Sequence, residues 1–202
     1  MAYKRSALME ERMAGARERI LLATRTLVAA GGYRSAPVTA VAAQAGVSTG
    51  LIYRHFPSKA DLFVEVLNAA VEHELRILDD IAAGSGAPVQ RLRQAVAAFV
   101  RRALAGPGLA HAFIVEPVDP EVEAERMRGR RRFGGVFRQL VEEGIACGAL
   151  PEQDPDVAAA CLVGAFTEAL VGPTAPSRQP HRDDDALVES ICGFCLRALG
   201  AR

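Results

Sequence analysis

The sequence predicts an all-α fold, in which three short helices precede a larger bundle of helices. Apolar residues recur every three or four positions in most segments, which is the period of an amphipathic helix. Glycine, proline and capping residues separate these segments at short intervals. No segment combines period-two alternation with β-branched residues between turn signals, and no internal repeat occurs. These observations predict helices and exclude a sheet.

The first predicted helix covers residues 11–30, where Ile20, Leu27 and Val28 form an apolar stripe and two glycines follow. A second, alanine-rich helix covers residues 38–45 and begins after a proline.

A third helix is predicted from residue 49 to residue 56. Gly46 lies where a left-handed turn residue ends the preceding helix, and Ser48 is placed to cap the next one. Pro57 ends the third helix, because the residue before a proline is pushed out of the helical region.

A longer helix is predicted from residue 59 to about residue 81, capped by Ser58, and residues 84–88 form the clearest break after it. Further on, Asp119 and Asp154 each precede a proline, which suggests an N-cap followed by a proline in the first turn. The remaining predicted helices cover residues 89–104, a short segment after 106–108, 120 to about 148, 156 to about 171, and 183–199.

The composition is that of an ordinary globular protein, with 50% hydrophobic and 24% charged residues. No run reaches the roughly 20 apolar residues that span a bilayer, and the N-terminal segment lacks the apolar region of a secretory signal. We therefore expect a cytoplasmic location and no membrane partner.

The cysteines are expected to be unpaired. Cys147, Cys161, Cys192 and Cys195 lie within apolar helical patterns, where a cysteine usually acts as a small buried hydrophobic residue. Cys192 and Cys195 form a CxxC pair, but no second pair of cysteines or histidines lies at zinc spacing. We predict no disulfide, no metal site and no cofactor.

The net charge of zero conceals an uneven distribution. Residues 1–60 hold nine lysines and arginines against three acidic residues, whereas the remainder holds 15 against 21. A basic N-terminal part suggests contact with an anion such as nucleic acid, although a solvated charged helix face is the alternative.

Residues 38–56 have the spacing of a helix-turn-helix. Two helices that cross steeply approach closely only at a small residue, which Ala42 supplies. Gly46 permits the tight turn, and Val41, Ala45 and Ile52 are placed for the buried side. In such a unit the second helix enters the major groove of DNA.

The candidate DNA-facing residues lie on the second helix and at the two helix starts beside it. Helix starts and hydroxyl or cationic side chains are suited to phosphate contacts. Lys59, one of two lysines beside 22 arginines, is predicted to bind phosphate, with an ordinary surface charge as the alternative. The set is Thr39, Ser48, Thr49, Gly50, Tyr53, Arg54, His55 and Lys59.

From Gly46 to Phe63 the chain reads GVSTGLIYRHFPSKADLF, which resembles the recognition region of the TetR family of transcriptional regulators. The resemblance covers residues 14–63. It implies a DNA-binding domain over residues 1–60, a helical ligand-binding and dimerisation domain over residues 61–202, and no enzymatic activity. It further implies a homodimeric repressor on palindromic double-stranded operator DNA, released by a small-molecule effector.

The resemblance also places the dimer interface on the last two long helices, which would form a four-helix bundle with those of a second copy. Two apolar stripes are the candidates, with core packing inside one chain as the alternative reading. Their residues are Leu162, Phe166, Leu170, Leu187, Ile191 and Phe194.

An effector pocket would be lined by apolar positions between the middle and the penultimate helices. His111 is the preferred polar candidate, with a surface position as the alternative. Three glycines in the helix after Pro120, Gly129 among them, suggest a kink or a weak point beside a ligand. The pocket candidates are Phe99, His111, Phe113, Met127, Phe133, Phe137 and Phe166.

Three alternatives to these assignments concern the basic run, catalysis and the function of the basic head. The basic run from Arg126 is interpreted as a solvated face paired with the preceding acidic residues, not as a second nucleic-acid site. An enzyme would need a nucleophile elbow, a phosphate loop or a metal-spaced set of ligands, which the sequence lacks. A helical interaction module with a basic head and no sequence-specific DNA binding is the alternative function.

Overall fold

The computed structural model describes residues 2–177 and 183–201 of the chain. This part of the chain forms helices and no strand, so the predicted all-α class is confirmed. The helices are α1 (Ala2–Gly31), α2 (Val38–Ala45), α3 (Thr49–His55), α4 (Lys59–Ala82), α5 (Pro88–Ala105), α6 (Pro107–Ile114), α7 (Pro120–Ala146), α8 (Pro155–Ala169), α9 (Val171–Thr174) and α10 (Asp184–Ala198).

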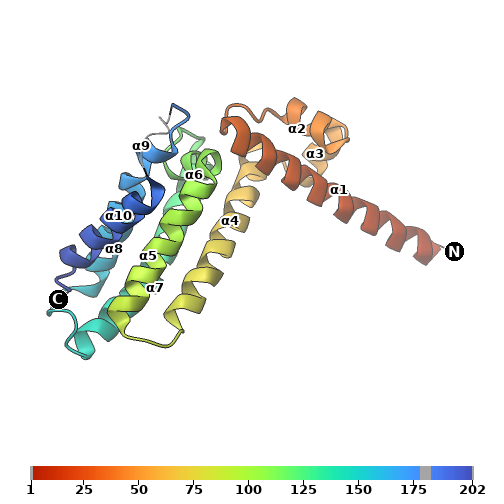
Figure 1. The fold of residues 1–202 in the computed structure, drawn as a ribbon. Helices are drawn as coiled ribbons and strands as arrows, with labels where there is room; N and C mark the ends of the chain where they lie inside the picture. Colours follow the sequence, from red (N-terminus) through yellow and green to blue (C-terminus); the bar gives the residue numbers. More distant parts are fainter. Residues whose placement is uncertain (1, 178–182, 202) are drawn as a thin grey trace.

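Helices α1 to α3 form a head at one end of the molecule (Figure 1). Helix α1 begins at Ala2 instead of residue 11, because no proline interrupts the polar segment before its apolar stripe. The fully buried side chains of Ile20, Val28, Val41 and Ile52 join the core that holds the three helices together. The head is therefore a small packed unit in which α1 supports α2 and α3.

Helix α4 connects the head to the rest of the molecule. The Ser58 hydroxyl oxygen accepts a hydrogen bond from the backbone N–H of Asp61 at 3.0 Å, which caps the helix as predicted. Near its start Phe63 packs edge-on against Tyr33 of the head, and further along Leu75 and Leu78 are buried. Helix α4 thus contributes to both parts, and any boundary near residue 60 falls in its first turn.

Helices α4 to α10 form the body (Figure 1). Helices α5 and α7 occupy its middle, and α8 and α10 lie on the side away from the head. The centre is filled by Phe137, Leu140 and Phe166, which are fully buried. These side chains fill the bundle on this side. The cavity described below lies nearer the head, where α1 forms part of its wall.

The head and the body meet where α6 crosses the end of α1. A Cβ atom at Gly108 of α6 would collide with the backbone carbonyl of Ala29 in α1. Only glycine allows the two backbones to approach this closely. This contact fixes the position of α6 relative to the head.

Candidate functional site

The turn between α2 and α3 has the geometry of a helix-turn-helix. Gly46 has φ +65° and ψ 42°, the left-handed conformation that glycine adopts without strain. Ala42 is 5% exposed, and its carbonyl accepts a hydrogen bond from the backbone N–H of Val47 at 3.0 Å. The small residue and the glycine therefore occupy the positions that the sequence predicted for them.

Helix α3 presents a polar outer face. The hydroxyl oxygen of Ser48 accepts a hydrogen bond from the backbone N–H of Leu51 at 3.2 Å, so this side chain caps the helix. Thr49, Gly50 and Arg54 are exposed, and Tyr53 leaves 52% of its surface exposed. Thr39 is also exposed, near the start of α2. A large exposed aromatic residue beside a threonine and an arginine suits contact with bases and phosphates.

Two further candidates are oriented differently. His55 is half-buried, and its Nε2 atom is buried without a hydrogen-bond partner. The Nζ atom of Lys59 donates to the carbonyl oxygen of Tyr33 at 2.7 Å and lies 3.8 Å from the centre of that ring. Burial lowers the pKa of Lys59, partly opposed by Asp119 and Glu116. In this conformation its ammonium group binds within the chain at the boundary between head and body.

An acidic clamp, formed by Glu116 and Asp119 between α6 and α7, holds the end of the head. The Glu116 carboxylate accepts hydrogen bonds from the backbone N–H groups of Tyr33, at 2.8 Å, and Arg34, at 3.4 Å. The Tyr33 hydroxyl donates to the Asp119 carboxylate. Burial and this hydrogen bond raise the pKa of Tyr33.

The predicted side-chain cap by Asp119 is therefore wrong. Asp119 stands at the N-cap position of α7 but makes no side-chain hydrogen bond to the helix, because its carboxylate binds Tyr33. Asp154, in contrast, caps α8 by accepting from the N–H groups of Asp156 and Val157 at 2.9 and 3.1 Å. The two aspartates differ because Asp119 lies beside a donor from a distant segment, the Tyr33 hydroxyl, whereas Asp154 accepts hydrogen bonds from its own helix.

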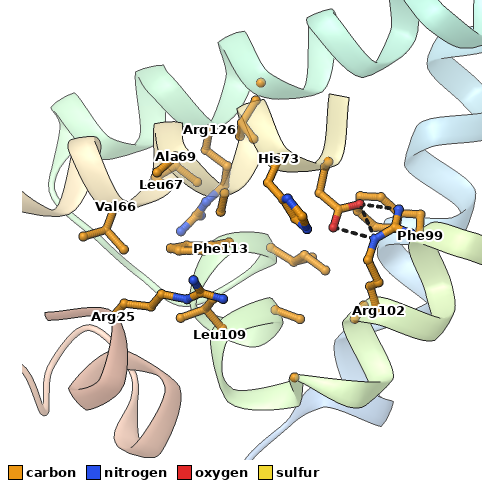
Figure 2. Close-up of a pocket in the computed structure, with 18 of the residues that line it drawn as sticks. Arg25, Val66, Leu67, Ala69, His73, Phe99, Arg102, Leu109, Phe113 and Arg126 are labelled. Atoms are coloured by element: carbon orange, nitrogen blue, oxygen red, sulfur yellow. Dashed lines mark hydrogen bonds and ion pairs between the residues drawn. The ribbon is translucent and has the colours of Figure 1, made fainter. Parts of the chain in front are cut away.

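A cavity of about 640 Å³ lies between the head and the body. Its wall takes residues from α1 and from α4 to α8, and Figure 2 shows 18 of them. Leu67, Val71 and Phe113 contribute apolar surface, and Leu21 and Leu22 of α1 bring the head into the wall. The volume is within the range of about 300–1,000 Å³ typical of small-molecule sites.

The predicted pocket residues divide into two groups. Phe99, Phe113 and Phe133 line the cavity. The others do not: Phe137 and Phe166 are buried beside it, with ring centroids 5.4 Å apart, because they fill the core between α7 and α8. The Nδ1 atom of His111 is buried without a hydrogen-bond partner, and Met127 is 41% exposed on α7.

The polar part of the cavity wall was missed by sequence reasoning. Arg126 and Arg130 line the cavity together with Gly129, although the basic run was assigned to a solvated face. Arg126 is 7% exposed and so is buried. The sequence does hold one signal for this position. Arg126 and Phe133 are seven residues apart, which places them on the same side of a helix. Arg128 does fit the prediction, because it is exposed and forms an ion pair with Glu125.

Gly129 has a packing role. A Cβ atom there would lie 3.1 Å from a methyl group of Val71, so the glycine lets α7 approach α4 beside the cavity. Helix α7 is continuous from Pro120 to Ala146, and Gly134 and Gly135 face open space.

The stripes predicted for the dimer interface lie inside one chain. Leu162, Phe166, Leu170, Leu187 and Ile191 are buried, at 6% exposure or less, because the largest apolar residues of α8 and α10 fill the body core. Phe194 alone of that set is exposed, at 56%. The outward face of α8 instead carries Val157, Cys161 and Gly164.

The four cysteines also divide into a buried pair and an exposed pair. Cys192 and Cys195 are buried, and burial raises the pKa of Cys195 to about 11. Cys147 and Cys161 are exposed, which corrects the expectation of burial. Cys161 lies on the outward face of α8, and Cys147 follows the end of α7. Within residues 2–177 and 183–201 no helix combines the length and apolar character needed to cross a membrane.

The family model of bacterial regulatory proteins of the tetR family matches residues 20–66, and that of the tetracyclin repressor-like C-terminal domain matches residues 85–170. The transcriptional repressor KstR of Mycolicibacterium smegmatis is 37% identical over 143 residues, covering 69% of each chain. KstR of Mycobacterium tuberculosis is 36% identical over 53% of this chain and 49% of that protein.

Solved structures share the fold. FadR of Bacillus subtilis, solved in complex with stearoyl-CoA, has a TM-score of 0.78 at 20% identity and covers 90% of this chain and 98% of its own. A TetR/AcrR regulator of Thermobifida fusca has a TM-score of 0.70 at 28% identity, covering 89% and 96%. RolR in complex with resorcinol has a TM-score of 0.71 at 22% identity, covering 96% and 91%.

Proposed function

Because this chain belongs to the TetR family of DNA-binding transcriptional regulators, we propose that it is a repressor that binds palindromic operator DNA as a homodimer. A small effector bound in the cavity releases the DNA. The chain is a regulator and not an enzyme.

The exposed face of α3 is the observation that carries the DNA-binding role. Thr49, Gly50, Tyr53 and Arg54 are exposed there, while Ile52 on the opposite side is 1% exposed and anchors the helix. A rigid short helix with a polar outer face can enter the major groove, where side chains read base edges. Thr39 and Ser48 lie at the two helix starts, where phosphate contacts position the head.

A second copy of the chain is proposed to bind the outward face of α8 and α10. Val157 of α8 is 58% exposed and Phe194 of α10 is 56% exposed, and large exposed apolar residues are candidates for an interaction site. Gly164 has open space where a side chain would project, so a partner helix can approach closely. This face replaces the buried stripes as the proposed dimer surface.

The cavity supports control by an effector because the head forms part of its wall. Leu21, Leu22 and Arg25 belong to α1, so an occupant touches the head directly. Two recognition helices reach successive major grooves only when they are roughly 34 Å apart. An effector that favours another spacing shifts the population away from the DNA-binding form, by no more than its preference between the two.

The acidic clamp provides the second connection. Glu116 holds the N–H of Tyr33, and its own carbonyl oxygen accepts a hydrogen bond from Arg126 of the cavity wall at 2.8 Å. Phe113 of the cavity packs against Phe63, which packs against Tyr33. A change at the cavity therefore reaches the head through direct contacts.

The function is tested by selecting bound duplexes from a random DNA pool with purified protein, at salt high enough to suppress nonspecific phosphate binding. A recovered palindrome is expected. Tyr53→Ala should weaken binding to it by about tenfold or more, as the loss of a base or phosphate contact predicts. Thr26→Ala is the control, because its hydroxyl bonds only the Leu22 carbonyl of its own helix.

Recovery of no preferred sequence, with equal affinity for heparin and every duplex, would contradict the proposal. That outcome would instead support a basic interaction module that docks an acidic partner.

A further inference from the structure

The charged side chains of the cavity wall are predominantly cationic. Four arginines line the cavity, and Glu74 is the acidic residue among them. The Glu74 carboxylate is already paired with Arg102, whose Nε and Nη2 atoms lie 2.7–3.0 Å from its oxygens. Arg25, Arg126 and Arg130 are left without a carboxylate in the lining itself.

Arg126 is only partly satisfied by its protein partners. Its Nη1 atom lies 2.6 Å from the Glu123 carboxylate, and Nη2 donates to the carbonyls of Ala112 and Glu116 at 3.2 and 2.8 Å. Its Nε atom is buried without a hydrogen-bond partner. A buried guanidinium donor without an acceptor is costly, so the site is suited to a further acceptor.

Arg130 adds a second positive charge one helical turn further along α7. One of its Nη atoms donates to the carbonyl oxygen of Ile114 at 3.0 Å, and it forms no ion pair with any described residue. Burial lowers the pKa of Arg126 and repulsion by the charge of Arg130 lowers it too, whereas the carboxylates of Glu123 and Glu116 oppose this shift. A bound anion would relieve this repulsion.

Arg25 brings the third charge from the head. It is exposed on α1 and forms no hydrogen bond or ion pair with any described residue. Figure 2 shows Arg25 and Arg126 directing their guanidinium groups toward the end of the cavity where Phe113 lies. Arg102 and Phe99 lie at the other end, and His73 lies between the two ends.

The rest of the wall is apolar. Phe99 and Phe133 pack edge-on with ring centroids 5.7 Å apart, and Leu67 and Val71 of α4 extend the same surface. At the opening Leu22 is 64% exposed, which leaves apolar surface uncovered. A ligand that fits this wall needs an apolar body as well as a charge.

We propose that the cavity binds an amphipathic anion, with its apolar body against Phe99 and Phe133 and its carboxylate or phosphate held by Arg126 and Arg130 of α7 and Arg25 of α1. The inference rests on the proposed function only in naming this ligand the effector. Because Arg25 belongs to the head and the other two arginines belong to the body, the ligand bridges the two parts.

The binding test compares three probes of equal chain length by isothermal titration calorimetry on the full chain. They are laurate, lauroyl-CoA and the neutral 1-dodecanol. At least one anion should bind about tenfold or more tightly than the alcohol, since hydrogen bonds to charged groups are the stronger ones. Tight laurate binding identifies a carboxylate, and tight binding of lauroyl-CoA alone identifies the phosphates. Equal binding of all three, or binding of none, overturns the proposal.

The arginine test uses two variants and a neighbouring control. Arg25→Gln and Arg130→Gln should each weaken binding of the preferred anion about tenfold while binding of 1-dodecanol stays unchanged. Arg131→Gln, one residue away on the exposed side of α7, should change neither. Arg25 is exposed, so its replacement leaves the fold intact, and melting curves check this for each variant. If both cavity variants behave like Arg131→Gln, the proposal is wrong.

The two proposals fail separately. Sequence-specific DNA binding without anion binding refutes the ligand class and leaves the regulator unaffected. Arginine-dependent anion binding without a preferred duplex supports the ligand class and refutes the proposed DNA-binding function. If the anion is the effector, adding it should also release the selected duplex from the wild-type protein but not from Arg130→Gln at the same concentration.

Discussion

The predicted DNA-facing surface and the cavity are built in opposite ways. The surface comes from one continuous segment, residues 39–54, whose short helices and single tight turn leave Thr39, Thr49, Tyr53 and Arg54 exposed. The cavity collects its wall from α1 and from α4 to α8, between Leu21 and Thr167. A surface from one segment can change without disturbing the bundle, whereas a cavity between six helices changes with their packing. Helix α1 packs against α2 and α3 and also lines the cavity, so the packing around it connects the surface with the cavity.

The largest expected effect comes from a substitution that separates the proposed dimer into monomers, each with a single DNA-binding head. Phe194→Asp places a charge on the proposed dimer face, so size-exclusion chromatography with light scattering should show a monomer. Operator affinity should fall by about a hundredfold, because a monomer loses the second head and its effective concentration. Met127→Asp replaces another exposed apolar residue, on α7, and should leave the dimer intact. A dimeric Phe194→Asp protein would disprove the assigned face.

A smaller effect is expected where the head meets the body. Gly108→Ala puts a methyl group against the Ala29 carbonyl, and α6 must move away from α1. Overpacking of this kind costs about 1–3 kcal/mol, which for a chain of this size lowers the melting temperature by roughly 2–12 °C. Effector and operator affinities should both change, because α6 lines the cavity and contacts the head. An unchanged melting temperature would show that this contact is loose.

The clamp at Tyr33 should give a moderate, pH-dependent effect. Tyr33→Phe removes the hydrogen bond to Asp119 and should cost about 0.5–1.5 kcal/mol at neutral pH. The pKa of Tyr33 is raised in the folded state, so its contribution is complete below the unfolded value of 10.0 and is lost as pH rises above it. Denaturant unfolding of both proteins at pH 7 and pH 11 measures the cost of the substitution and how that cost changes with pH. The wild type should therefore lose part of its advantage over Tyr33→Phe at pH 11, and an undiminished advantage would contradict the raised pKa.

The smallest expected effect is a gain. Gly135→Ala lies in the interior of α7, where a new methyl group meets no atom within 4 Å, so helix propensity alone should act. Stability should rise by up to about 1 kcal/mol. Gly129→Ala on the same helix is the matched comparison, because its methyl group would meet Val71 at 3.1 Å and the gain should be reduced or reversed. Equal gains at both positions would show that Val71 moves away easily.

The sequence by itself determined the all-α class, most helix positions and the helix-turn-helix, because these depend on local patterns. Gly46, Ser48 and Pro57 act on their immediate neighbours, and spacing of three or four residues identifies an apolar face without any knowledge of its partner. Helix α9 was not predicted, since four residues are too few to show a period.

Tertiary structure decided which neighbour each face meets. The stripes of α8 and α10 were correctly identified as apolar, but only packing showed that Leu162 and Leu187 face their own core while Phe194 faces outward. Arg126 belongs to a basic run that looks solvated, yet α7 turns it into the cavity beside Phe133. Asp119 has the position of a cap but binds Tyr33, 86 residues away in the chain. Local periodicity gives the direction of a side chain around its own helix, whereas its partner depends on contacts between distant segments.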